Sequence, residues 1–274
     1  MPTLTPLRFG YNFGNHELPP EFAYPPLIET WLGVDFAPPA SFLAVSAGEW
    51  RQRLGPEWPA AWQSIGPAER HAPGRPEIEQ QLRNVMGDRA IRFHQNGFCF
   101  GWLGYEGNLY ARYEAIRDGF VATLDSVQDV MPKLGQPHRW NVTYVNRIPQ
   151  GSVWSSPADW SFFRLWQPNP LKKLKIEPEG FVGQWQFPLD AERGTLCIEL
   201  THEPIVDSGS ELEYLWLRLT ASGVIESHEA ALFDGLDYGR EICVRAFNEL
   251  VTTDAKQFWG ERELPTKRDL PSKK

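Results

Sequence analysis

The chain has 274 residues, 42% of them hydrophobic, and its formal net charge is -8. This length allows one large domain or two of ordinary size that share a core. The acidic balance disfavours nucleic acid as a partner but leaves room for one basic patch. No apolar run approaches the roughly 20 residues of a membrane helix, and the first residues do not resemble a secretory signal peptide. We therefore expect a cytoplasmic protein with no membrane partner.

The three cysteines, Cys99, Cys197 and Cys243, lie far apart and form no Cys-x-x-Cys pair. This pattern is typical of buried thiols in a reducing cytosol rather than of a disulfide framework. The His-Glu pair at 228–229 begins a zincin-like pattern, but the second ligand position holds Leu232. Since no other histidines lie at ligand spacing, the sequence predicts no metal site and no cofactor.

The N-terminal part of the chain is rich in proline. Residues 1–26 contain six prolines and no hydrophobic periodicity, so we expect an extended arm. A strand over 27–36 follows, and a capping box predicts a short helix over 46–54. Apolar residues at spacings of three and four predict another short helix over 76–86.

The rest of the first half, residues 27–150, carries a hairpin and a long helix. Strands over 90–94 and 98–102 flank an Asn-Gly turn, which supplies the positive dihedral angles of a tight hairpin. Apolar residues then recur along one stripe from 109 to 131, which predicts a long amphipathic helix. A strand over 139–148 closes this half.

The second half, residues 151–260, begins in a Trp-rich segment. Strands over 181–187 and 195–201 form a predicted antiparallel pair, and a further strand covers 212–220. A second long helix is predicted over 228–251, and residues 261–274 form a polar tail. The sequence thus predicts an α+β fold in which antiparallel sheets pack against two long helices. The similar stripes of these helices indicate either two pseudo-repeated halves or a chance match of two amphipathic patterns.

No motif for catalysis stands out. The glycines at 101, 104 and 107 match neither the dinucleotide fingerprint nor the P-loop, and no serine lies in a nucleophile elbow. His202 and Glu203 form an acid/base pair by residue type only. Several carboxylates cluster in sequence and could converge in a dispersed site: Glu199, Glu203, Glu211 and Glu213. We lean toward a protein that is not an enzyme.

One segment interleaves aromatic rings with cations. It holds Trp160, Arg164, Trp166, Lys172 and Lys173. Such a pattern can stack bases and neutralise phosphates, but a hydrophobic segment followed by a solvated lysine turn gives the same pattern. The chain has twelve tryptophans, several times the ordinary usage, and aromatic rings are enriched at binding surfaces.

Three short blocks resemble a known family. They are Pro-Pro-Leu-Ile-Glu at 25–29, Tyr-Val-Asn-Arg-Ile at 144–148 after a long helix that begins near Tyr113, and the His-Glu start of the closing helix. Together they resemble a sporadically distributed, uncharacterised bacterial family of similar length. The resemblance implies a bacterial, cytosolic protein whose scattered occurrence is typical of mobile or defence-associated genes, and it implies no active site.

Within those blocks, Glu29 and Arg147 lie in two predicted strands. They could form a cross-strand ion pair, or they could anchor a ligand at the mouth of a pocket. Our leading hypothesis is a non-enzymatic binding protein that acts through another protein, such as an accessory or antitoxin-like component of a bacterial defence or toxin system. The alternatives are a ligand- or nucleic-acid-binding module that uses a Trp-rich cleft, and an enzyme with a dispersed site.

Overall fold

The computed structural model describes residues 21–37, 50, 53–58, 78–94, 96–105, 109–130, 134–189, 194–204, 212–225 and 231–262. Most of the predicted N-terminal arm, most of the helix predicted over 46–54, the first residues of the closing helix and nearly all of the polar tail lie outside these residues.

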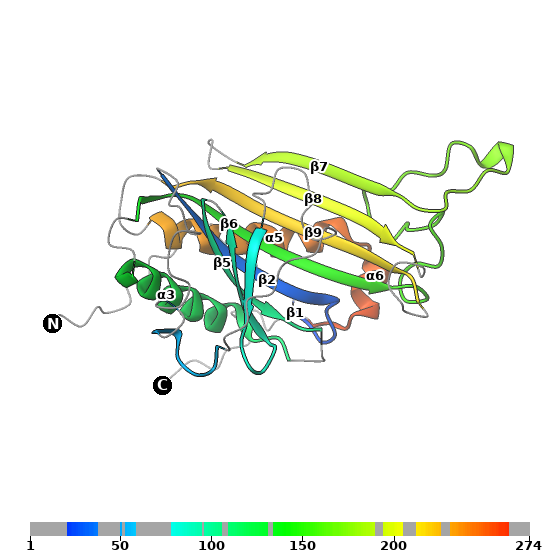
Figure 1. Ribbon diagram of the computed structural model, residues 1–274. Coiled ribbons are helices and arrows are strands. Elements are labelled where there is room, and N and C mark those ends of the chain that lie inside the picture. The colour runs from blue at the N-terminus through cyan, green and yellow to red at the C-terminus, as the bar shows by residue number, and fades with distance from the viewer. Residues whose placement is uncertain are drawn as a thin grey trace, which may run out of the picture.

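An eight-stranded antiparallel sheet forms the body of the molecule (Figure 1). Its order is β3-β4-β5-β2-β6-β9-β8-β7. The strands are β2 (Leu27–Ala37), β3 (Ile78–Arg83), β4 (Arg89–His94), β5 (Gly97–Leu103), β6 (Gln136–Pro149), β7 (Val182–Leu189), β8 (Gly194–Glu203) and β9 (Tyr214–Val224). A separate two-stranded sheet joins β1 (Glu21–Phe22) to β10 (Glu261–Arg262). The strands predicted within residues 27–36, 90–102, 139–148, 181–201 and 212–220 are therefore present.

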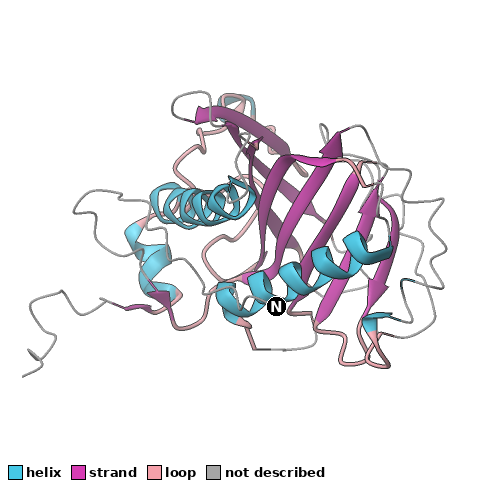
Figure 2. Ribbon diagram, turned by 90° about the vertical axis from the view of Figure 1, so that its left-hand side faces the viewer, coloured by secondary structure: helices cyan, strands magenta, loops and turns pink. Residues whose placement is uncertain are grey.

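Two helices cover one face of the sheet, α3 (Arg112–Val130) and α5 (Ala231–Leu250). Leu32 of β2 is paired with Phe100 on one side and Val142 on the other, so these three side chains share a face. Phe100 lies against Gly119 of α3, and Val142 lies against Gly239 of α5. Figure 2 shows the two helices running in different directions against the sheet. A short helix, α6 (Thr253–Phe258), follows α5.

The tryptophans mainly build the core. Seven of them are buried: Trp31, Trp50, Trp58, Trp102, Trp140, Trp154 and Trp259. Four more are half-buried: Trp160, Trp166, Trp185 and Trp216. Among the described residues, the tryptophans thus lie largely in the interior, on both faces of the sheet, and this weakens the tryptophan content as a sign of a binding surface.

The helix predicted over 76–86 is wrong, because the segment forms the edge strand β3. Gln81 and Leu82 pair with residues of β4, and a β-bulge follows Ile78. Of the residues that suggested a helical stripe, Leu82 is buried, whereas Val85 is 68% exposed in the turn after the strand. A three-and-four spacing in so short a segment does not distinguish a helix from a bulged strand, because a bulge shifts the two-residue alternation by one position.

No helix in the described part of the chain is long and apolar enough to cross a membrane.

Helix α5 approaches the sheet through glycines. A Cβ atom at Gly235 would lie 2.3 Å from Trp140 Cδ1, and one at Gly239 would lie 2.6 Å from Trp140 Cζ3. The indole ring is held on a central strand and is 3% exposed, so it has little room to move. The absence of side chains at these two positions sets how closely the helix can pack.

We expect Gly235→Ala to lower the free energy of unfolding by about 1–3 kcal/mol, because overpacking against Trp140 outweighs the gain in helix propensity. Urea denaturation measures this change. Glu249→Ala, on the exposed side of the same helix, is the control and should change stability by less than about 0.5 kcal/mol. A more stable Gly235→Ala protein would show that the helix and the sheet are not in close contact here.

Candidate functional site

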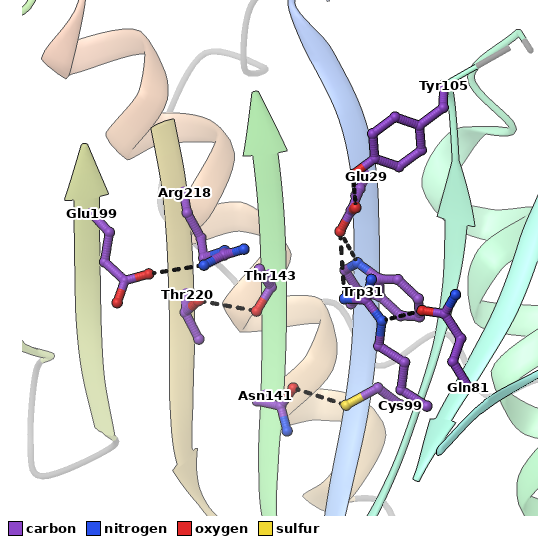
Figure 3. A network of polar contacts seen from close by, with 11 residues as sticks. Glu29, Trp31, Gln81, Cys99, Tyr105, Asn141, Thr143, Glu199, Arg218 and Thr220 are labelled. Carbon is purple, nitrogen blue, oxygen red and sulfur yellow. Dashed lines mark hydrogen bonds and ion pairs between the residues drawn. The ribbon is translucent and has the colours of Figure 1, made fainter. Parts of the chain in front are cut away.

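The face of the sheet opposite the helices carries a chain of polar contacts, part of which is drawn in Figure 3. Successive side chains of a strand point to opposite faces. On β2, Leu32 points toward the helices, so Glu29, Trp31 and Gly33 point away from them. We call this side the open face. It receives alternate residues from every strand of the sheet.

Glu29 is the centre of the polar network on the open face. Its carboxylate accepts a hydrogen bond from the Trp31 indole at 2.6 Å and a short one from the Tyr105 hydroxyl, and it lies 3.5 Å from a guanidinium nitrogen of Arg92. Arg92 donates from Nε to Gln81 at 2.7 Å, and its guanidinium lies 3.8 Å from the centre of the Trp31 ring. The side chains come from three strands, β2, β3 and β4, and from the segment after β5, and they form one network around a buried carboxylate.

This network keeps Glu29 ionised. Burial raises the pKa of Glu29, but the Arg92 charge and the hydrogen bonds from Tyr105 and Trp31 more than offset that effect, so its pKa lies below the ordinary value for glutamate. A carboxylate with a depressed pKa and all its neighbours engaged is a poor general base. We conclude that Glu29 holds the structure together rather than performing proton transfer.

The predicted ion pair between Glu29 and Arg147 is wrong. Glu29 pairs in register with Val145, and its cationic partner is Arg92, two strands away. The Arg147 guanidinium instead lies over two tyrosine rings, 5.8 Å from the centre of Tyr105 and 4.8 Å from that of Tyr214. The two predicted residues are still linked, because Tyr105 donates its hydroxyl to Glu29 and presents its ring to Arg147.

The carboxylates that cluster near residue 200 do not converge where they are described. Glu199 pairs with Arg218 at 3.3 Å, Glu203 accepts from the Trp216 indole at 2.6 Å, and Glu213 lies 3.0 Å from His202 Nε2. His202 and Glu203 are neighbours on one strand, so they point to opposite faces of the sheet. They form no acid/base pair. Glu211 lies outside the described residues.

The Trp-rich segment is anchored at its base. The Trp160 ring stacks on Phe181 with centres 4.4 Å apart and also packs near Trp166. Arg164 donates from its backbone nitrogen to Leu250 O at 2.7 Å and from its side chain to Val251 O at 3.2 Å. These rings and this arginine therefore fix the segment to the end of α5 and the start of β7, and they do not form an open stacking surface for bases.

Lys172 and Lys173 lie on a separate feature, residues 169–177, which we call the basic tip. Figure 1 shows this part of the chain projecting beyond the start of β7. The Asn169 side chain accepts from the Leu171 backbone nitrogen at 2.9 Å and donates to Ile176 O at 2.7 Å, so one amide ties both arms of the tip together. A single 3-10 turn, η2 (Lys172–Leu174), forms its end.

The sequence did not reveal several residues of these sites. Arg92 lies in a predicted strand, but the partner of its charge depends on the order of distant strands. Tyr105 gave no signal at all. Asn169 did give one, because an asparagine before a proline favours turns whose side chain bonds the backbone. Among the described residues, no group of three or more histidine, cysteine, aspartate or glutamate side chains could hold a metal ion.

A second pair of titratable side chains, His94 and Asp35, lies further along the open face. The Nδ1 atom of His94 accepts from the Asn96 backbone nitrogen at 3.3 Å, which places the proton of the neutral ring on Nε2, 3.5 Å from Asp35 Oδ1. Burial lowers the pKa of His94 to about 4 and raises that of Asp35 above its ordinary value, although Arg139 and His138 oppose the second effect.

We expect Glu29→Gln to lower the free energy of unfolding by roughly 3 kcal/mol, because it leaves the buried Arg92 guanidinium without a counter-charge. Arg92→Met should be destabilising as well, and the double variant should lose at least about 1 kcal/mol less than the sum of the two. Arg147→Met combined with Glu29→Gln should deviate less from additivity, because these two residues are linked only through Tyr105. Chemical denaturation of all five variants tests both statements, and coupling of Glu29 to Arg147 instead of Arg92 would contradict the network described above.

Stability should also depend on pH through His94. Because its pKa in the folded protein is lowered from 6.5 to about 4, the stabilisation from the neutral ring is fully present above pH 6.5 and is lost as the pH falls toward 4. The loss is about 3 kcal/mol, reduced by Asp35, whose raised pKa acts in the opposite direction. His94→Gln should remove most of this decline in denaturation midpoints measured from pH 7 to pH 4. An unchanged decline would mean that other groups cause it.

The chain matches no protein-family model and no curated protein. The resemblance of its short motifs to a bacterial family therefore stays a prediction. The function of the molecule has to be argued from its own surfaces, and those are the open face with Arg147 and the end of the sheet that carries β7 and the basic tip.

Proposed function

We propose that this protein is a binding protein without catalytic activity, and that it docks an acidic segment of a partner protein against strand β7 and the basic tip. The observation that carries the proposal is the concentration of exposed aliphatic and aromatic side chains there. Five large hydrophobic residues between positions 171 and 187 are at least 40% exposed: Leu171, Leu174, Ile176, Val182 and Phe187. Val182 and Phe187 lie on opposite faces of β7, since five positions separate them on the strand, and exposed apolar side chains gathered in one part of a chain are typical of interaction sites.

The basic tip is organised before any partner binds. The Asn169 side chain closes its two arms, and the backbone nitrogens of Leu174 and Lys175 donate to Leu171 O and Lys172 O within the turn. Side chains three residues apart eclipse each other in a 3-10 turn, so Leu171 and Leu174 project on the same side. A surface that is already ordered loses little conformational entropy on binding.

Strand β7 offers backbone groups as well. It is the terminal strand of the sheet, it has eight residues, and none of them is charged. Natural proteins usually protect a long edge strand with lysines, inward-pointing charges or very short length, because its free N–H and C=O groups can pair with another chain. Pro188 is the one protecting feature of this kind in β7. An extended partner segment can therefore add to the sheet as a further strand.

The charges select an acidic partner. Lys172, Lys173 and Lys175 are exposed on the tip, and no ion pair engages them within the described residues. Glu177, the acidic group of the tip, accepts a hydrogen bond from the Asn169 side chain at 3.3 Å. A protein with a net charge of -8 repels other acidic chains over most of its surface, so a local cluster of three lysines determines where such a chain can approach.

A peptide selection tests this proposal. Random twelve-residue peptides are displayed and selected on the full-length protein, and binding of the enriched peptides is measured by fluorescence anisotropy. We expect enriched peptides to be acidic with alternating apolar residues. Their affinity should fall at least tenfold for Lys172→Glu/Lys173→Glu and for Val182→Lys, which places a charge on the edge strand.

The matched control is Arg53→Glu/Lys256→Glu, which makes the same change in net charge away from the tip and should alter affinity less than twofold. Equal losses in both charge variants, or no acidic peptides after selection, would refute the proposal. Two further results would also overturn it: a dimer by light scattering that Val182→Lys dissociates, since a second copy would then cover β7, and binding to anionic lipid vesicles that needs Leu174, since the tip would then meet a membrane.

We also propose that the two halves of the molecule are structural repeats. In the first, the strand order β2-β5-β4-β3 is followed in the chain by α3; in the second, the order β6-β9-β8-β7 is followed by α5. The boundary of such repeats falls between α3 and β6, and not near residue 150, because β6 takes in the second half the place of β2 in the first. A wider role as an antitoxin-like or accessory component of a bacterial defence system remains our proposal on the family resemblance alone.

A further inference from the structure

We infer that the open face also contains a binding site for an oxyanion, a carboxylate or a phosphate, with Arg147 as its principal anchor and Arg218 as a second donor. This site lies on β6 and β9, which β8 separates from β7, and it does not depend on the function proposed above.

The guanidinium of Arg147 is positioned to bind an anion. It is half-buried and lies over the rings of Tyr105 and Tyr214. No ion pair or hydrogen bond engages that guanidinium within the described part of the chain. Stacking on ring faces satisfies the flat surface of a guanidinium but leaves its N–H groups at the rim unused. Those N–H groups are the ones that bind carboxylate or phosphate in a two-pronged manner.

The position of Tyr105 is fixed by the buried network around Glu29. Its hydroxyl donates to the buried Glu29 carboxylate, which Arg92 and Trp31 hold in turn. Because its hydroxyl is bonded to a buried carboxylate that is itself paired, the Tyr105 ring is held in position against Arg147 before a ligand binds. Glu29 is thus a positioning residue for the anchor, although it does not touch the anchor itself.

Arg218 brings a second donor to the same region. It pairs in register with Val145, and Arg147 follows Val145 by two residues on the same face. Such diagonal neighbours in an antiparallel pair are roughly 7–8 Å apart at the backbone, within reach of two long side chains. Arg218 donates one N–H to Glu199, while its Nε atom is buried and has no hydrogen-bond partner. A buried polar group without a partner is uncommon, and a ligand oxygen would satisfy it.

The surrounding carboxylates are already engaged. Glu29 faces Arg92, Glu199 faces Arg218, and Glu203 accepts from the Trp216 indole. The charge of Arg147 is therefore the one in this region that is not neutralised by a direct ion pair within the described residues. Both carboxylate and phosphate match the geometry of its N–H groups. The structure therefore predicts an oxyanion as the ligand, and the experiment distinguishes carboxylate from phosphate.

Nuclear magnetic resonance of arginine side chains provides the test. The Nε–Hε signals of the full-length protein are followed while sodium phosphate or sodium succinate is added at constant ionic strength, with sodium chloride as the reference. We expect saturable shifts of the Arg147 and Arg218 signals with one of the two oxyanions and none with chloride. The oxyanion that saturates identifies the source as phosphate or carboxylate.

Variants make the assignment specific. Arg147→Met should raise the dissociation constant, read from the Arg218 signal, at least tenfold. Arg147→Lys should raise it less, because lysine keeps the charge and loses only the paired N–H groups. Arg139→Met, on the same strand and the same face, is the matched control and should change it less than twofold.

Shifts that rise linearly with both oxyanions, or equal losses in the Arg147→Met and Arg139→Met proteins, would overturn the inference. If Arg147→Met does not fold, Arg147→Lys and the parent protein still decide the question. The Lys172→Glu/Lys173→Glu protein should keep the oxyanion response, so this site can fail or succeed independently of partner binding at the tip.

Discussion

The pairing of β2 with β6 is the interaction on which the molecule depends. These two strands lie at the centre of the sheet and pair from Leu27 with Asn146 to Ala37 with Gln136, with two register shifts. The other strands are joined to this pair on either side, β5, β4 and β3 through β2 and β9, β8 and β7 through β6. Helix α3 packs on the side of β2, and helix α5 packs on the side of β6. One ladder of hydrogen bonds therefore joins two half-sheets into a single layer with one continuous core.

The paired strands β2 and β6, which we call the central seam, have two chemically different faces. On the helix side the central seam presents Leu32, Val142 and Trp140, which make ordinary apolar contacts with the helices. On the open face it presents Glu29 and Trp31, which bond each other, and the Glu29 carboxylate is also contacted by Tyr105 and by Arg92 of β4. A buried charge costs free energy unless it is paired and hydrogen-bonded, so the open face can keep its ionised groups in position only because the strand order brings Arg92 to them.

Local pattern predicts much of this fold and little of its sites. The alternation and β-branched content of 27–36, the Asn-Gly turn and the apolar stripe of α3 each identify an element, because each depends on residues close in the chain. The partner of Glu29 depends instead on β5 lying next to β2, and no local signal carries that information. The separation of His202 from Glu203 could have been foreseen, since adjacent residues of a strand point to opposite faces. Strand β3 could not have been predicted in the same way, because its pairing with β4 outweighs a weak helical spacing of apolar residues.

The central seam also has a consequence for synthesis on the ribosome. β2 is made first and finds β5 soon afterwards, but β6 begins only at residue 136, so the growing chain exposes one edge of its most central strand for a long time. Pairing between distant segments is slow, and an unpaired edge invites association with other chains. Glu29 and Asp35 lie along this strand, and charged side chains disfavour such premature pairing. The carboxylates of β2 thus disfavour association of the unpaired strand during synthesis, in addition to making contacts in the folded sheet.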